Sequence, residues 1–183
     1  GNITAVYQQS VKRMLAYSSI AQAGFMMFVV IGSDVMGMKG MVLYAVAYTL
    51  ATLGIFAVLV KLKDYTYDGF NGLAKKEPFL AVVAAVCMMS LAGIPLTAGF
   101  FAKWYVLASA IRQDNTFWLV VFALVMAAVS VYYYFKVIIA MYFKKGEPEL
   151  NTAVTPFDKA LLAIVVCAII VLGVAPEMLL SWI

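Results

Sequence analysis

The stretch MMSLAGIPLTAGFFAKWYVLASAI, residues 88–111, decides the fold, because it suits a helix in lipid at all but two positions. Pro95 lies near its middle, and Lys103 follows eight residues later. A proline inside a helix lacks the amide hydrogen, and its ring collides with the carbonyl four residues back, here that of Leu91. A lysine at membrane depth is costly because its charge leaves water. Both residues therefore require a structural explanation.

The composition indicates an integral membrane protein. Of 183 residues, 66% are hydrophobic and 12% are charged, whereas a soluble domain is about half apolar and about a quarter charged. The net charge of +4 is too small and too distributed to indicate nucleic-acid binding. The sequence has no His, and Cys87 and Cys167 lie 80 residues apart in apolar runs, which is not a disulfide or metal-ligand pattern. We therefore expect no metal and no cofactor in this chain.

Five apolar runs are long enough to cross a membrane, which takes about 20 residues. The third run is too long for one straight helix, since its 34 residues would span ~51 Å at ~1.5 Å each. The sequence therefore predicts an all-α polytopic membrane protein, with residues 1–183 in a single membrane domain. The runs cover about 14–32, 41–60, 78–111, 116–143 and 159–182.

The third run is expected to be steeply tilted or broken, and Pro95 favours a break. Gly93 and Gly99 flank the proline and lower the cost of irregular backbone. The predicted halves are 78–92 and 98–111, joined by a short unwound segment. Such backbone survives at membrane depth only where protein or water satisfies it, and discontinuous helices often mark ion and substrate sites in transporters. A simple proline kink is the alternative that Pro95 alone leaves open.

The distribution of Lys and Arg predicts the orientation. Nine lie on one side and two on the other, while Lys103 and Lys136 fall inside apolar runs. Basic residues accumulate in cytoplasmic loops, so we expect the start of the chain in the cytoplasm and its C-terminus on the outer side. The nine are Lys12, Arg13, Lys61, Lys63, Lys75, Lys76, Lys144, Lys145 and Lys159, and the two are Lys39 and Arg112.

Lys103 is the strongest candidate for a functional residue. It lies ~13 Å from the outer end of its run, where burying a cation costs from about 3 to over 10 kcal/mol. Desolvation disfavours the charged form of a lysine, which makes reversible protonation feasible. The alternative is a structural role, in which the lysine is paired permanently with a carboxylate. None of the nine acidic residues lies within an apolar run. The sequence therefore favours a proton-relay role for Lys103.

Lys136 is a weaker candidate, because it lies ~12 Å along its helix from Lys144 and can snorkel toward the cytoplasmic side. Snorkelling and a cytoplasmic relay role both remain open for it. Tyr134 and the two tyrosines before it cover three directions of the helix, so at least one is expected to face the interior. Other polar side chains are expected to bond between helices or to hold water. They are Ser18, Ser19, Gln22, Thr49, Thr52, Ser90, Thr97 and Ser109.

Three motifs together resemble one known family. KRMLAYSSIAQAGF at 12–25, SLAGIPLTAGFFAKWYVL at 90–107 and VYYYFKV at 131–137 are similar to the antiporter-like, proton-pumping membrane subunits of NADH:quinone oxidoreductase, respiratory complex I. Within that family the subunit N branch is the best fit. The M branch carries Glu at the position of Lys103, and the L branch has His and Lys in the helix that matches 41–60.

The resemblance implies that the chain is the C-terminal part of a fourteen-helix subunit. It would hold the second inverted repeat of an antiporter-like fold plus a terminal helix, without the first repeat. The third run would be the broken helix of that repeat, and Lys103 its proton-transfer lysine. The family topology places the C-terminus outside, in agreement with the charge distribution. The implied location is the bacterial cell inner membrane or the mitochondrial inner membrane.

The resemblance also implies a mechanism. Quinone reduction elsewhere in the complex would change buried charges, and Lys103 would gain or lose a proton in response, with Lys136 and the nearby tyrosines on the cytoplasmic connection. The chain would then be part of an enzyme, NADH:quinone oxidoreductase, without a redox centre of its own. Its partners would be other membrane subunits and the lipid bilayer.

Three other functions remain open. A subunit of a multisubunit cation/proton antiporter would share the fold and the lysine, and so would a related complex fed by ferredoxin. A structural membrane scaffold that does not pump would tolerate the loss of Lys103.

Overall fold

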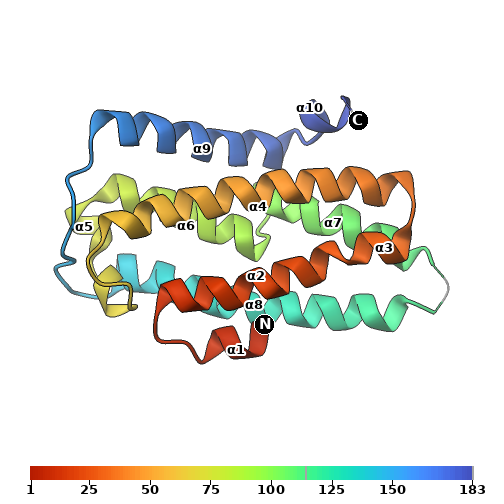
Figure 1. Cartoon of the computed structure of the whole chain (residues 1–183), viewed down its shortest axis with the longest axis horizontal. Helices are drawn as coiled ribbons and strands as arrows, with labels where there is room; N and C mark the ends of the chain where they lie inside the picture. The colour runs from red at the N-terminus through yellow and green to blue at the C-terminus, as the bar shows by residue number, and fades with distance from the viewer. Residues whose placement is uncertain (114, 183) are drawn as a thin grey trace.

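The computed structural model describes residues 1–113 and 115–182, and the described elements are helices (Figure 1). The longer helices run roughly along one axis of an elongated bundle. Two isolated bridges, Ser10 with Thr66 and Leu62 with Leu150, are the extended pairings of the described chain. The elements are α1 Asn2–Val6, α2 Val11–Met26, α3 Phe28–Gly32, α4 Val35–Lys61, η1 Asp68–Phe70, α5 Leu73–Lys76, α6 Pro78–Ala92, α7 Ala98–Ile111, α8 Phe117–Phe143, α9 Pro156–Val174 and α10 Glu177–Leu180.

Four helical segments are long and apolar enough to cross a membrane. They are Val11–Gly32, which combines α2 and α3, and the helices α4, α8 and α9. Each overlaps one of the apolar runs seen in the sequence. The remaining run, 78–111, forms two shorter apolar helices, α6 and α7.

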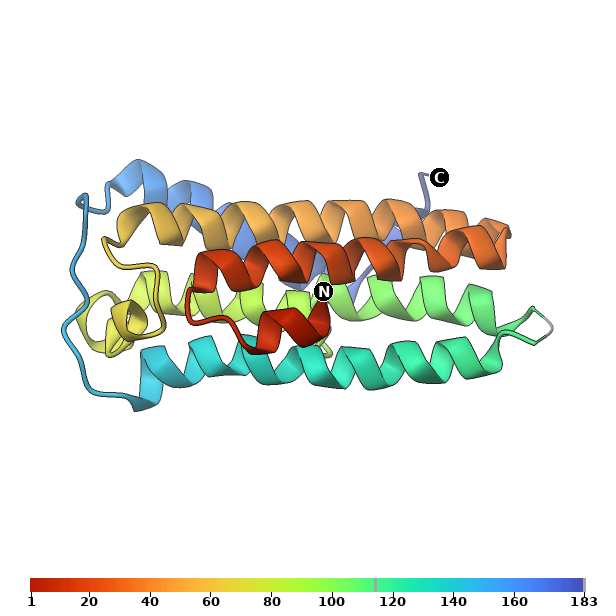
Figure 2. The same ribbon diagram turned by 60° about the horizontal axis from the view of Figure 1, so that its bottom comes forward.

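The helices α6 and α7 lie end to end along the bundle axis (Figure 2). Their bounds, Pro78–Ala92 and Ala98–Ile111, coincide with the two ranges expected from the sequence. Ten of the fifteen residues of α6 are buried, against eight of the 27 in α8. Because α6 packs against α4, α8 and α9, it occupies the middle of the bundle, and its C-terminal end lies inside the protein.

The fifth run is shorter than the sequence suggested. We expected a span over about 159–182, but α9 ends at Val174 and the chain turns before α10. The cause is Pro176, because a proline disfavours helical backbone in the residue before it, and Ala175 has φ −132° and ψ 69°. Lys39 of α4 then donates to the carbonyl of Leu180 at 3.0 Å, which ties α10 to the bundle.

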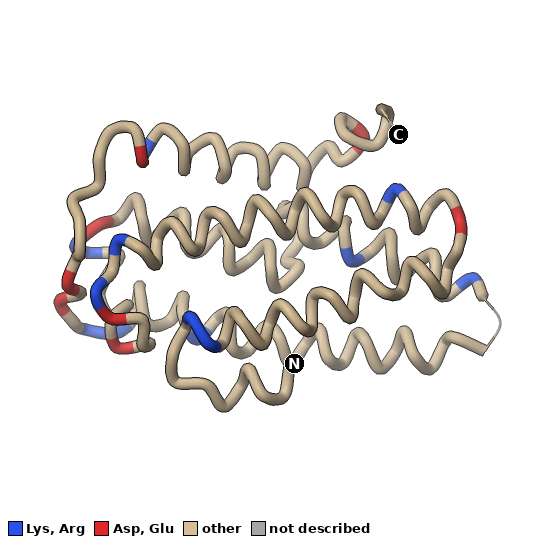
Figure 3. The backbone as a smooth tube through the Cα atoms, in the orientation of Figure 1, with Lys and Arg blue, Asp and Glu red and all other residues tan. Residues whose placement is uncertain are grey.

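Most charged residues gather at one end of the bundle, hereafter the basic end (Figure 3). There the segment after α8 pairs with the segment after α4, since the amide of Lys63 donates to the carbonyl of Glu149 at 3.0 Å. Ion pairs join Lys63 to Glu149 at 3.0 Å and Lys61 to Asp158 at 2.6 Å. The opposite end carries few charges (Figure 3), and Arg112 directly follows α7 there.

Candidate functional site: a buried lysine at a helix interruption

The interruption between α6 and α7 is made by a glycine rather than by the proline alone. Gly93 ends α6 in the left-handed region at φ +84°, which only glycine adopts at no steric cost. The amides of Gly93 and Ile94 both donate to the carbonyl of Met89 at 3.0 Å. Pro95 follows within the connection and is exposed in this chain. The last carbonyls of α6, those of Leu91 and Ala92, therefore have no helical partner and are free to accept other donors.

The start of α7 packs directly on the end of α6, and Gly99 makes this contact sterically allowed. A Cβ at Gly99 would lie 1.8 Å from the carbonyl oxygen of Ser90. The amide of Gly99 also donates to Ser90 Oγ at 3.3 Å. Any side chain at this position would push the two helices apart, so glycine fixes where α7 begins and how it is placed against α6.

Lys103 lies one turn further along α7 and points back to the end of α6. Its side chain is buried, with 7% of the residue exposed. The Nζ donates to the carbonyl oxygens of Leu91 at 2.9 Å and Ala92 at 3.0 Å, and it lies 5.0 Å from the centroid of the Phe25 ring. Among the described residues no carboxylate forms an ion pair with it. The ammonium is therefore held by carbonyl dipoles and a ring face.

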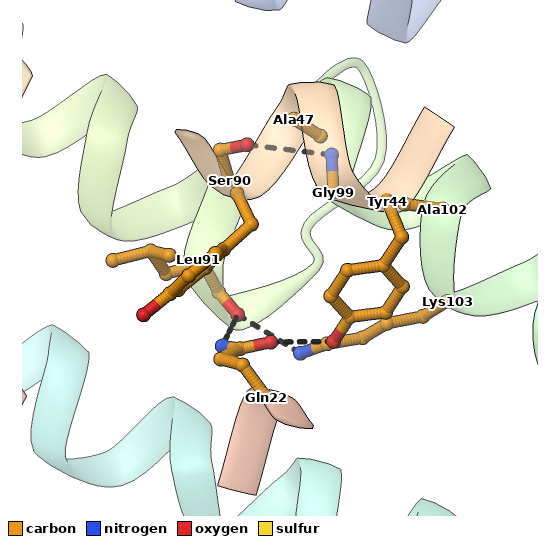
Figure 4. Close-up of a pocket in the computed structure, with 9 residues that line it drawn as sticks. Gln22, Tyr44, Ala47, Ser90, Leu91, Gly99, Ala102 and Lys103 are labelled. Atoms are coloured by element: carbon orange, nitrogen blue, oxygen red, sulfur yellow. Dashed lines mark hydrogen bonds between the residues drawn. The ribbon is translucent and has the colours of Figure 1, made fainter. Parts of the chain in front are cut away.

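A polar network surrounds this lysine (Figure 4). Gln22 of α2 donates to the carbonyl of Leu91 at 3.0 Å, so one carbonyl serves both Gln22 and Lys103. The same amide nitrogen donates to the hydroxyl of Tyr134 at 2.9 Å, and Tyr134 bonds in turn to Ser18. Tyr44 donates to the carboxamide oxygen of Gln22. The network thus joins five helices, α2, α4, α6, α7 and α8.

A small cavity of about 10 Å³ lies beside Lys103, lined also by Gln22, Tyr44, Tyr48 and Leu91. That is about the smallest volume of this kind that accommodates one water. Apart from this cavity, the Lys103 side chain is surrounded by protein groups. The described residues contain no group of three His, Cys, Asp or Glu side chains that could hold a metal.

The structure brings some of the predicted site residues together and keeps one apart. Gly93, Gly99, Lys103 and Tyr134 all take part in the interruption or in its network. Lys136 does not, because its Nζ lies 4.1 Å from the ring centroid of Tyr67, a residue of the segment between α4 and α5.

Two tyrosines near Lys103 were missed in the sequence. Tyr44 bonds to Gln22, and Tyr48 lines the cavity beside Lys103. They lie four residues apart in α4, which places both on one face, and that spacing was a usable signal.

A second polar cluster fixes the C-terminal end of α7. Asp34 caps α4, accepting from the amide of Gly37 at 2.7 Å, and also accepts from the hydroxyl of Ser109 near the end of α7. Arg112 lies 3.8 Å from the same carboxylate. The hydrogen bond from Ser109, followed by that from Gly37, holds the pKa of Asp34 below its usual range. The helix that carries Lys103 is thus anchored at both ends.

These features define a polytopic α-helical membrane protein that holds an ionisable residue inside its bundle, a feature typical of proteins that move ions or substrates. The comparison with known families gives the particular group. A sequence model described as NADH:quinone oxidoreductase/Mrp antiporter, transmembrane, matches residues 1–130. The chain belongs to this family.

Individual relatives agree with the resemblance found in the sequence. The chain is 42% identical to a protein of Cytophaga hutchinsonii named NADH-quinone oxidoreductase subunit N, over 99% of this chain and 40% of the relative. It superposes on one chain of the respiratory complex I from Thermus thermophilus with bound aureothin. The TM-score is 0.89 and the identity 33%, over 98% of this chain and 42% of that chain. The predicted likeness to subunit N is confirmed, and the chain spans about 40% of the length of such relatives.

The fold also occurs in a different class of membrane complex. The Mrp complex from Dietzia superposes at a TM-score of 0.82 with 19% identity, over 98% of this chain and 42% of that one. At this identity the likeness shows a shared fold.

Proposed function

We propose that the chain is a proton-translocating membrane part of an NADH:quinone oxidoreductase and that Lys103 is its proton-carrying residue. The observation that carries this proposal is a lysine with 7% exposure, held by two backbone carbonyls and no carboxylate among the described residues. The relatives named subunit N support the choice of complex.

In this proposal α6 and α7 form one discontinuous span, so that the chain crosses the membrane five times within a single membrane domain. The basic end faces the cytoplasm, which follows the excess of Lys and Arg in its loops. The C-terminus then lies on the outer side, and the membrane is the bacterial cell inner membrane or the mitochondrial inner membrane. Pro95 and the two glycines of the interruption would serve to hold Lys103 away from both surfaces.

The chemistry of the site suits reversible protonation. An ammonium has three N–H donors and a neutral amine keeps two, so the carbonyls of Leu91 and Ala92 can accept hydrogen bonds from either form. The balance between the two forms then depends on nearby charge. At an effective dielectric constant of about 20, a unit charge ~10 Å away contributes about 1.7 kcal/mol, which is more than a tenfold change in protonation. A distant charge change can therefore load or unload Lys103.

The partners follow from this role. Other membrane subunits of the complex would supply the changing charge, and quinone would be reduced elsewhere, with no redox centre or cofactor proposed in this chain. Tyr134 is the proposed neighbour of the proton path because it shares Gln22 with the lysine network. Lys136 is a second proposed relay on the cytoplasmic side, supported by its place in α8 between that tyrosine and the basic end.

A cation/proton antiporter subunit is the main alternative, since the family description includes Mrp antiporters. The 42% identity to a subunit N protein and the 33% identity to complex I, against 19% to an Mrp complex, favour the oxidoreductase. A related complex fed by ferredoxin would leave this chain almost unchanged, and redox subunits that copurify with it would distinguish the three.

The test is proton pumping in vesicles by the assembled complex carrying Lys103→Ala, measured together with its quinone reductase rate. We expect pumping to fall by at least about tenfold, since the substitution removes the proton carrier, with assembly retained. Lys75→Ala at the exposed basic end is the matched control and should pump normally. Normal pumping by an intact Lys103→Ala complex would leave Lys103 as a tolerated structural charge, as in a scaffold.

A further inference from the structure

The connection between α6 and α7 is a tight turn. The carbonyl of Ile94 accepts hydrogen bonds from the amide of Thr97 at 3.3 Å and from its hydroxyl at 2.6 Å. Pro95 and Leu96 lie between these two residues, and Leu96 has φ +72°. Proline at the second position and a positive φ at the third are typical of a type II turn, in which the third residue is usually glycine or asparagine. Here that position holds a leucine.

The backbone of Leu96 is therefore strained. A bulky residue rarely adopts a positive φ, and such strain persists only where the surrounding structure leaves the backbone no alternative. The Leu96 side chain does not supply this support within the described chain, because 71% of the residue is exposed. The turn must be held through its backbone.

Gly173 of α9 lies directly against this backbone. The glycine is buried, and a Cβ on it would lie 2.5 Å from the Leu96 carbonyl oxygen and 2.5 Å from both the Cα and the carbonyl carbon of Thr97. All three are backbone atoms, so no side-chain rotation would relieve the contact. Glycine weakens a helix relative to alanine, and packing on the turn accounts for its presence in α9.

The end of α9 is itself fixed to the bundle just beyond Gly173. Lys39 of α4 donates to the carbonyl of Leu180 in α10, and the hydroxyl of Tyr105 in α7 donates to the carboxylate of Glu177 at 3.2 Å. Leu180 is buried. These contacts hold α9 and α10 against α4 and α7, so Gly173 has a defined position against the turn.

The turn joins the two parts of the lysine site. Before it lie the carbonyls of Leu91 and Ala92, which accept from Lys103 at 2.9 and 3.0 Å, and after it begins α7, which carries the lysine. A displacement of the backbone of Leu96 and Thr97 would move the start of α7 relative to the end of α6. Both hydrogen bonds are lost once their lengths exceed about 3.5 Å, so they tolerate little displacement.

We propose that Gly173 is a positioning residue for Lys103. Its contact with the backbone of Leu96 and Thr97 holds the strained turn in place, and the turn keeps Lys103 at the free carbonyls of α6. The role of this contact in proton transfer rests on the proposed function of Lys103, whereas its effect on the geometry of the site is measured without that function.

The first experiment measures the geometry. Structures of the assembled complex are determined by electron cryo-microscopy with Gly173→Ala and with Gly24→Ala, the control at which a Cβ meets nothing within 4 Å. We expect Gly173→Ala to lengthen at least one distance between Lys103 Nζ and the two carbonyls beyond about 3.5 Å, the limit of a hydrogen bond. Gly24→Ala should leave both distances unchanged. Unchanged distances in Gly173→Ala would overturn the proposal.

The second experiment separates positioning from general stability. Ile169→Ala is the matched variant, because Ile169 is fully buried one turn before Gly173 in α9, and its truncation removes packing without adding atoms at the turn. At equal complex content, we expect Gly173→Ala to lower the pumping rate at least ~10-fold, since a misplacement of about 1 Å can cost ~100-fold. The KM for quinone should not change, because the proposed function places quinone elsewhere in the complex.

Ile169→Ala should lower the Tm and keep most of the pumping rate. An equal loss of pumping in the two variants at equal Tm would make Gly173 a merely structural residue and overturn the positioning role.

The third experiment covers a Gly173→Ala complex that fails to assemble. In the Gly173→Ala background, Leu96→Gly gives the turn a residue that adopts positive φ without steric cost, whereas Leu96→Ala keeps the restriction of a residue with a Cβ. We expect Leu96→Gly to recover assembly and pumping, and Leu96→Ala to recover neither. The same result in both double variants would overturn the link between Gly173 and the strained turn.

The two proposals fail separately. Normal pumping in Lys103→Ala would overturn the proposed function and leave the measured geometry of the Gly173→Ala complex intact. Loss of pumping in Lys103→Ala together with normal pumping in Gly173→Ala would leave the function of Lys103 intact and overturn the positioning role of Gly173.

Discussion

Lys103 and Lys136 are two cations in apolar helices of the same bundle, and their surroundings differ. Lys103 is buried and donates to two backbone carbonyls. Lys136 is half-buried and lies over the ring of Tyr67 at 4.1 Å from its centroid. The described structure gives neither lysine a carboxylate partner. The difference is that backbone carbonyls accept hydrogen bonds from Lys103, whereas Lys136 lies over an aromatic ring.

The reason is the continuity of the helix opposite each lysine. A continuous helix uses its own carbonyls, and only its last turn leaves them free. The interruption after α6 places such free carbonyls in the middle of the bundle, where Lys103 needs them. Lys136 finds an aromatic face instead, and burial raises the pKa of Tyr67 to about 12, so its phenol stays neutral beneath the cation. A helix end, rather than a lysine as such, makes the candidate site.

The largest expected effect comes from Gly99→Ala, which changes the contact between α6 and α7 at the interruption itself. The new Cβ would meet the Ser90 carbonyl at 1.8 Å, and such overpacking costs about 1–3 kcal/mol or more. We expect a lower Tm and loss of pumping in the assembled complex. Gly24→Ala on α2 is the matched control, because a Cβ there meets nothing within 4 Å. If both variants behave like the parent, the close contact of α6 and α7 does not position Lys103.

Gln22→Leu should have the next largest effect. It removes the donor to the Leu91 carbonyl and one of the two partners of the Tyr134 hydroxyl, which keeps Ser18. The buried hydroxyl of Tyr44 loses its acceptor, and an unsatisfied buried group costs about 1–3 kcal/mol. The melting temperature and the rate of proton pumping would both fall. Ser19→Ala is the control, because among the described residues that hydroxyl bonds to the carbonyl of Ala16 in its own helix and to no other group. Equal Tm values for the two variants would show that the network adds nothing at Lys103.

Lys136→Met should have a smaller effect and sharpens the comparison directly. Loss of the contact with Tyr67 is expected to cost about 0.5–2 kcal/mol of stability. Pumping should fall less than in Lys103→Met, measured in the same vesicles at equal complex content. An equal loss of pumping would make Lys136 as essential to proton transfer as Lys103.

Asp34→Asn should have the smallest effect, at the C-terminal end of α7. The hydrogen bond from Ser109, ahead of that from Gly37, lowers the pKa of Asp34 from 3.8. A carboxyl whose pKa is lowered by folding stabilises the protein above its unfolded pKa and loses that contribution as pH falls through the folded pKa.

The difference in Tm between the parent protein and the Asp34→Asn variant should accordingly stay constant from about pH 8 to 5 and shrink below about pH 4. Thermal scans at several pH values check this. A difference that does not change with pH would show that the contact acts without the charge.

The sequence itself was sufficient to predict the membrane class, the overlap of the apolar runs with the helices and the bounds 78–92 and 98–111. Hydrophobic run length, glycine and proline act within a few residues, so their effect on the backbone is readable locally. The burial cost of a cation likewise marked Lys103 before any fold was known. The end of α9 at Val174 was missed although Pro176 is an equally local signal.

The tertiary structure decided what surrounds Lys103. Gln22 contacts a carbonyl 69 residues away, and Ser18 contacts Tyr134 across 116 residues. In the sequence, Tyr44 and Tyr48 look like ordinary members of a membrane helix. Only the packing of α4 on α2 and α7 places them at the cavity beside Lys103. Hydropathy and helix breakers act along the chain, whereas hydrogen bonds, cavities and the Asp34 cluster arise between segments. A local pattern therefore predicts where the backbone breaks, and only the packed bundle determines which groups meet there.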